Sequence, residues 1–163
     1  MTSYRSSPEI TDLFSRLLPP DARLRVASVQ RAGAVPVFEV AETDAAYEDA
    51  LRRAVAWAGE EGGLAAVIAP WKHEARRIQT LLGDDAPTYV ASGTGLPPSG
   101  VVLITLELAK GLEFDRVVIP DASPRIFPAD DDLARRRLYT TVSRATRGVR
   151  VIARGKLTPL LGE

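Results

Sequence analysis

The chain has 163 residues, of which 45% are hydrophobic and 26% charged, a composition typical of one globular domain. It contains no cysteine and a single histidine, which excludes disulfides, thiolate metal sites and a cysteine nucleophile. The 21 basic residues equal the 21 acidic ones, so no overall charge attracts nucleic acid or a membrane surface. No apolar run approaches the roughly 20 residues of a membrane span and no signal peptide opens the chain, so we expect a cytoplasmic protein without a membrane partner.

The first half of the chain alternates predicted helices and strands. A helix over residues 10–18 is expected to begin either at a capping box of Ser6 and Glu9 or at Ser7 with Pro8 in the first helical position. The elements that follow are a strand at 35–40, a helix at 44–58, a strand at 64–69 and a helix at 72–82. This order is typical of a parallel sheet in which helices make the crossovers.

The second half continues the alternation. Residues 84–100 are rich in Gly, Pro, Ser and Thr and predict a loop, with at most a short strand at 89–91. The elements expected beyond it are strands at 101–106 and 117–119, a helix from Asp130 or Asp131 to about residue 146, and a strand at 149–153. Only a single helical turn fits between residues 106 and 115. We therefore predict an α/β fold with a mostly parallel sheet of about five strands and helices on both faces.

A phosphate loop is absent from this sequence. No G-x-x-x-x-G-K-[ST] pattern occurs, and Ser92-Gly93-Thr94-Gly95 lacks the lysine that would follow. His73 has no second ligand candidate nearby, so we interpret it as a surface side chain.

The turn Ala109-Lys110-Gly111-Leu112-Glu113 lies between two predicted strands. In an open α/β sheet ligands dock at strand ends, and Gly111 would allow a close approach of the backbone to a ligand. Lys110 could offer a positive charge and Glu113 could accept hydrogen bonds from a sugar. Taken alone, the turn also fits a purely structural role.

Arginines mark the last predicted helix. Ala134, Leu138, Val142 and Ala145 fall on one stripe, and Arg137, Thr141 and Arg144 fall on a neighbouring one. Arg144, near the end of this helix, could be aimed at a phosphate. Of the 21 basic residues 18 are Arg, a bias that suits phosphate or carboxylate recognition and equally reflects a GC-rich genome.

Three segments in this order resemble motifs IV, V and VI of the UvrD/Rep-like superfamily 1 helicases. They are Ser3-Tyr4-Arg5-Ser6-Ser7, Thr105-x-x-x-Ala109-Lys110-Gly111-Leu112-Glu113-Phe114-Asp115 and Arg136-Arg137-Leu138-Tyr139-x-x-x-Ser143-Arg144-Ala145. They look most similar to the HelD-type branch and span nearly the whole chain. The resemblance implies that residues 1–163 are a single, second RecA-like motor domain, excised from a longer protein whose first domain carries the phosphate loop.

The resemblance assigns five residues to an ATP site. It implies that Tyr4 stacks on adenine, that Arg5 and Arg144 face the γ-phosphate, and that Gly111 and Glu113 lie beside the nucleotide, Glu113 on the ribose. Arg144 and Arg5 would be the catalytic cations. ATP and magnesium would bind in the intact protein, whereas this chain alone would hold neither tightly and would be inactive.

The resemblance also assigns a nucleic-acid contact. Thr105 matches the motif V threonine that touches the strand backbone, while Glu107 replaces the histidine found in many relatives and would repel phosphate. The implied partners are the first RecA-like domain and DNA, single-stranded or duplex. Two other interpretations remain: a non-catalytic helicase-like module that binds RNA polymerase or another protein, and an unrelated small α/β binding domain.

Overall fold

The computed structural model describes residues 36–161, which form a six-stranded sheet in the order β1-β6-β5-β2-β4-β3. Every neighbouring pair of strands is parallel. The strands are β1 Val37–Ala41, β2 Leu64–Ala69, β3 Thr88–Tyr89, β4 Gly100–Thr105, β5 Phe114–Ile119 and β6 Ala145–Arg154. The α/β prediction is confirmed, with six strands where about five were expected. The predicted first helix, Tyr4 and Arg5 lie outside the described residues.

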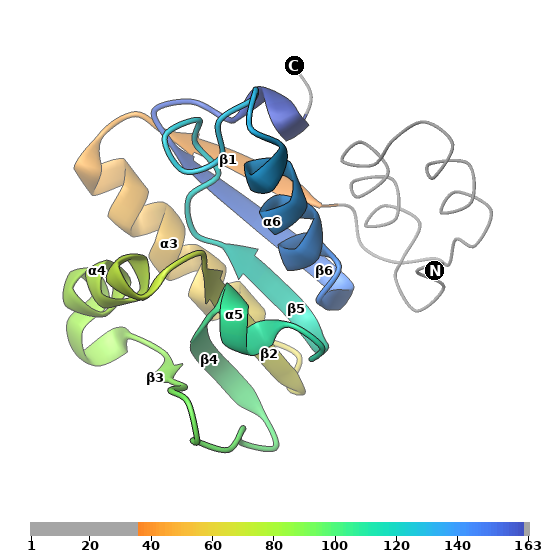
Figure 1. Cartoon of the computed structure of the whole chain (residues 1–163). Coiled ribbons are helices and arrows are strands. Elements are labelled where there is room, and N and C mark those ends of the chain that lie inside the picture. The colour runs from red at the N-terminus through yellow and green to blue at the C-terminus, as the bar shows by residue number, and fades with distance from the viewer. Residues whose placement is uncertain (1–35, 162–163) are drawn as a thin grey trace.

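Helices cover both faces of this sheet (Figure 1). They are α3 Asp44–Ala58, α4 Lys72–Leu82, α5 Leu106–Ala109 and α6 Asp132–Val142. Short 3-10 turns follow at Gly83–Asp85 and Pro159–Leu161. The bounds of α3 and α4 are those predicted, because apolar periodicity and flanking glycines mark both helices in the sequence. The connection from β4 to β5 holds only the four-residue α5, as expected for so short a crossover.

The central strand shows how the core divides into two layers. Ala65 and Val67 of β2 pack with Leu51 of α3 and Ile78 of α4. The alternate residues of β2 belong to the opposite cluster, which contains Leu138 of α6. Because side chains alternate along a strand, burial on both faces requires an almost continuous apolar run, which is the pattern of β2.

Helix α6 ends four residues before its predicted end. Asp131 caps its start by accepting hydrogen bonds from the N–H groups of Leu133 and Ala134, which decides between the two predicted caps. The apolar stripe appeared to continue through Ala145 because that residue is also buried, but it is buried as the first residue of β6. Ser143 and Arg144 form the turn between the two elements.

A buried tyrosine connects α3 to the end of β5. The hydroxyl of Tyr47 donates a hydrogen bond of 2.7 Å to the carbonyl of Pro120 and accepts one of 3.0 Å from Arg77. Burial raises the pKa of Tyr47, an effect that Arg77 partly offsets. The folded protein therefore holds this phenolic proton more tightly than the unfolded chain does.

Tyr47→Phe is expected to lower the free energy of unfolding by about 1–2 kcal/mol at neutral pH, because one buried and one partly buried hydrogen bond are lost. The contribution of the raised pKa is fully present below the unfolded pKa of about 10 and disappears as the pH rises through the folded pKa. Urea unfolding between pH 8 and pH 11 should show a steeper alkaline loss for the wild type than for the variant. Parallel pH profiles would contradict this role of Tyr47.

Among residues 36–161, no helix has the length and apolar character needed to cross a membrane.

Candidate functional site

Arg144 contacts the turn that precedes β5. Its Nη1 donates a hydrogen bond of 3.2 Å to the carbonyl of Leu112, while Nε binds the carbonyl of Thr140 at 3.1 Å and Nη2 binds Ser143 Oγ at 3.1 Å. The backbone adds a second connection, because the carbonyl of Arg144 accepts a 2.8 Å bond from the N–H of Phe114. The structure thus brings together the two sequence segments in which a ligand site was predicted.

The turn residues Gly111 and Glu113 lie beside Arg144 at the start of two paired strands. Glu113 directly precedes Phe114 and Arg144 directly precedes Ala145, and Phe114 and Ala145 are register partners in β5 and β6. Gly111 has a φ of 83°, a left-handed conformation that favours glycine. A Cβ added there would meet nothing within 4 Å, so the backbone at this point is open to a ligand.

The Arg144 guanidinium keeps hydrogen-bonding capacity beyond these contacts. Its three bonds use one N–H on each nitrogen, and a guanidinium carries five N–H groups. One N–H on each terminal nitrogen is therefore left over among the bonds within residues 36–161. N–H groups of a guanidinium are suited to donate to the oxygens of a phosphate. Arg144 can thus contact an anion without leaving its position.

Thr105 lies at the opposite end of the strands from Gly111. We call the side of the sheet where the strands begin the amino edge and the side where they end the carboxyl edge. Thr105 is the last residue of β4 and pairs with Ala69, the last residue of β2. Because β4 and β5 are both parallel to β2, the turn at Gly111 lies at the amino end of β5. Ligands of open α/β sheets bind at carboxyl ends, so the reason given for expecting a ligand at this turn does not apply. A strand of six residues spans roughly 17–20 Å, which separates the two edges.

Exposure differs among the residues at the carboxyl edge. Thr105 is only 4% exposed, so little of its side chain faces solvent, whereas Glu107 in α5 is exposed. The carboxylate of Glu107, which replaces the histidine of many relatives, is therefore accessible to a nucleic-acid strand at this edge. Lys110, in the turn beyond α5, is also exposed.

The two arginines predicted to share a stripe on α6 have separate contacts. Arg137 lies over the ring of Trp71, with its guanidinium carbon 5.3 Å from the ring centroid, whereas Arg144 contacts Leu112. The ring of Trp71 also stacks on the imidazole of His73. The His73 side chain is 72% exposed, which confirms its interpretation as a surface residue.

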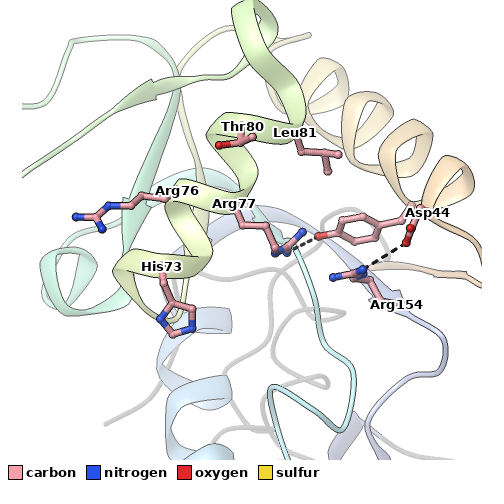
Figure 2. Close-up of a pocket in the computed structure, with 8 residues that line it drawn as sticks. Asp44, His73, Arg76, Arg77, Thr80, Leu81 and Arg154 are labelled. Carbon is pink, nitrogen blue, oxygen red and sulfur yellow. Dashed lines mark hydrogen bonds and ion pairs between the residues drawn. The ribbon is translucent and has the colours of Figure 1, made fainter.

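Sequence reasoning missed a cluster formed by Tyr47, Arg77 and Arg154. These residues come from α3, α4 and the end of β6, and together they line a pocket (Figure 2). No local motif joins them. The signal that could have found them is their position, because Arg154 ends a strand and Tyr47 lies in the first turn of the helix after β1.

The fold and the motif positions define the class of this domain. An all-parallel sheet covered by helices on both faces is the RecA-like architecture that was predicted, and the segments predicted to be motifs V and VI lie at adjoining strand starts. Residues 100–152, which include both motifs, match the family model of the UvrD-like helicase C-terminal domain.

A solved structure supports the same class. It is described as the C-terminal domain of a possible DNA helicase from Lactobacillus plantarum WCFS1, with a TM-score of 0.77 and 28% sequence identity over 98% of this chain and 92% of that chain. No curated protein matches the chain. The two comparisons support the UvrD-like helicase C-terminal domain that the motifs predicted; the assignment to the HelD-type branch stays a prediction.

Proposed function

We propose that this domain is the C-terminal half of an ATP-dependent superfamily 1 motor that translocates on DNA or unwinds it. The observation that carries the proposal is the position of Glu113 and Arg144 directly before two register partners, with Arg144 bound to the carbonyl of Leu112. Two distant motifs thereby form one surface at the amino edge of the sheet. The intact protein would act in the cytoplasm.

The amino edge would contribute one side of an ATP site. Arg144 offers two N–H groups to the γ-phosphate, Gly111 permits close approach, and Glu113 is exposed where it could accept a hydrogen bond from the ribose. The resemblance adds Tyr4 and Arg5 for adenine and phosphate. No three His, Asp or Glu side chains in residues 36–161 are grouped to hold a metal ion, so the acids for magnesium would come from the first RecA-like domain.

The carboxyl edge would contact the nucleic acid near Thr105. Because roughly one strand length separates this edge from the amino edge, a nucleotide and a strand could bind at the same time. Closing and opening of the gap between the two motor domains would then change the contacts to the strand. Glu107 would weaken the usual strand contact by repelling phosphate.

The proposal predicts that the purified 163-residue chain has no measurable ATPase activity, with or without DNA. Phosphoryl transfer needs cations on all sides of the γ-phosphate, and this domain supplies only one side. The measurement is phosphate release by the chain alone and by the chain joined to the phosphate-loop domain of its own protein. Turnover by the chain alone would contradict the proposal. A joined protein that binds RNA polymerase but hydrolyses no ATP would favour the non-catalytic module.

A further inference from the structure

A pocket of about 470 Å³ opens between α3, α4 and the end of β6. Figure 2 shows side chains from all three elements turned toward it. None of the residues assigned to the amino edge lines this pocket, and neither does Thr105. Its chemistry therefore calls for a separate explanation.

Three of the eight residues that line the pocket are arginines. Arg76, Arg77 and Arg154 line it, and Asp44 is the only acid among the lining residues. Two further carboxylates stand behind the arginines, but Glu74 is 5% and Asp121 3% exposed and neither lines the pocket. The surface that a ligand would meet is therefore positive.

Two guanidinium groups converge on one aromatic ring. The guanidinium carbons of Arg77 and Arg154 lie 5.3 and 5.1 Å from the ring centroid of Tyr47. Arg77 is fixed by hydrogen bonds from Nε to Glu74 and from Nη2 to the Tyr47 hydroxyl. Its Nη1 takes part in neither bond. Arg77 thus has a fixed orientation and a donor to spare.

Arg154 is held more loosely. Its Nη2 is 3.4 Å from Oδ1 of Asp44, whose side chain is 98% exposed, and an ion pair of that kind contributes little free energy. An anion between Arg77 and Arg154 would reduce the repulsion between the two positive charges. It would also accept hydrogen bonds from their remaining N–H groups. Arginine forks from two directions are suited to the oxygens of a phosphate.

The position of the pocket agrees with this ligand. After β2 the chain continues into α4 on one face of the sheet, and after β5 it continues to α6 on the other. In open α/β sheets ligands bind at the carboxyl ends of strands where neighbouring connections leave in opposite directions. Tyr47 reaches this point through its bond to Pro120, the residue after β5.

We propose that this pocket binds a phosphate group through Arg77 and Arg154. The phosphate could belong to a free anion or to the backbone of a strand. In the second case the inference rests on the proposed nucleic-acid edge, because the pocket and Thr105 lie at the same edge of the sheet.

The test follows the side-chain Nε–H signals of arginine by NMR in the 163-residue chain during two titrations. One uses inorganic phosphate and the other a single-stranded oligothymidine. At least one of the two ligands should shift the signals of Arg77 and Arg154. A response to both or to the oligonucleotide alone identifies a site that accepts strand backbone, and a response to inorganic phosphate alone identifies a free-phosphate site. No shift with either ligand would overturn the proposal.

Three variants make the test specific. Arg154→Gln should weaken binding of the shifting ligand about tenfold, since one charge-assisted hydrogen bond is lost. Asp44→Asn should strengthen it about two- to fivefold, because the competing acid is removed. Arg147→Gln, at the other end of the same strand and 75% exposed, removes the same charge and should change nothing. Equal weakening by Arg147→Gln and Arg154→Gln would show only a general charge effect and overturn the site.

The salt dependence separates this inference from the proposed function. If the strand backbone occupies the pocket, Arg154→Gln should reduce the slope of log K against log salt for single-stranded DNA by about 0.7. If the wild-type chain binds inorganic phosphate but no DNA, the result would count against the nucleic-acid edge and leave the pocket supported.

Discussion

Arg144→Ala in the intact motor is expected to lower the ATP turnover rate by about 10³- to 10⁵-fold and to leave nucleotide affinity within about tenfold. The reason is that an arginine facing the γ-phosphate acts mainly on the charge that develops in the transition state. DNA-stimulated phosphate release and nucleotide binding measure the two effects. An unchanged turnover rate would contradict the proposed role and favour the non-catalytic module.

Two further substitutions define the controls for this prediction. Arg135→Ala, in the neighbouring helix α6, should affect neither turnover nor binding. Arg144→Lys should restore little activity, since one ammonium cannot reproduce the two-pronged geometry of a guanidinium.

A structural effect of Arg144→Ala must be measured separately, because Arg144 also binds Leu112 and Thr140 through their carbonyls. Its loss leaves the carbonyl of Leu112 short of a donor, whereas the carbonyl of Thr140 keeps the bond from Ser143 Oγ, and the expected loss of stability is about 1–3 kcal/mol. Thermal melting of the three variants measures this effect. A turnover loss that followed the melting temperature across the series would assign Arg144 to positioning of the turn.

Phe114→Ala is expected to lower the free energy of unfolding by about 3–5 kcal/mol. Phe114 is 2% exposed and belongs to the cluster between the sheet and α6, so its truncation leaves a cavity. Its backbone N–H, which binds the carbonyl of Arg144, is retained. Urea unfolding followed by circular dichroism measures the loss. Leu133→Ala on α6 is the control, since that leucine is 51% exposed and its truncation should cost far less. Similar losses for both variants would contradict this packing.

Much of the fold could be predicted because its determinants are local. Helix α3 was predicted with its observed bounds, since an amphipathic pattern and a following glycine are both short-range signals. The end of α6 was not predicted, because Ala145 is buried in β6 and mimics the helical stripe. The candidate site was predicted in part. The motifs drew attention to Gly111, Glu113 and Arg144, which lie at one edge of the sheet, and their contact with a nucleotide stays a prediction. The fixed contact of Arg144 with Leu112 depends on the register of β5 and β6.

The sequence by itself determined the α/β class, the burial of the strands on both faces and the similarity to UvrD-like helicase C-terminal domains, because composition, periodicity and motif spacing are properties of short segments. Only the tertiary structure decided which edge of the sheet each residue occupies. It placed Thr105 at the carboxyl edge and Arg144 at the amino edge, and it brought Tyr47, Arg77 and Arg154 around one pocket. The physical reason is that strand order and register arise from packing between segments far apart in the chain, which no single segment encodes.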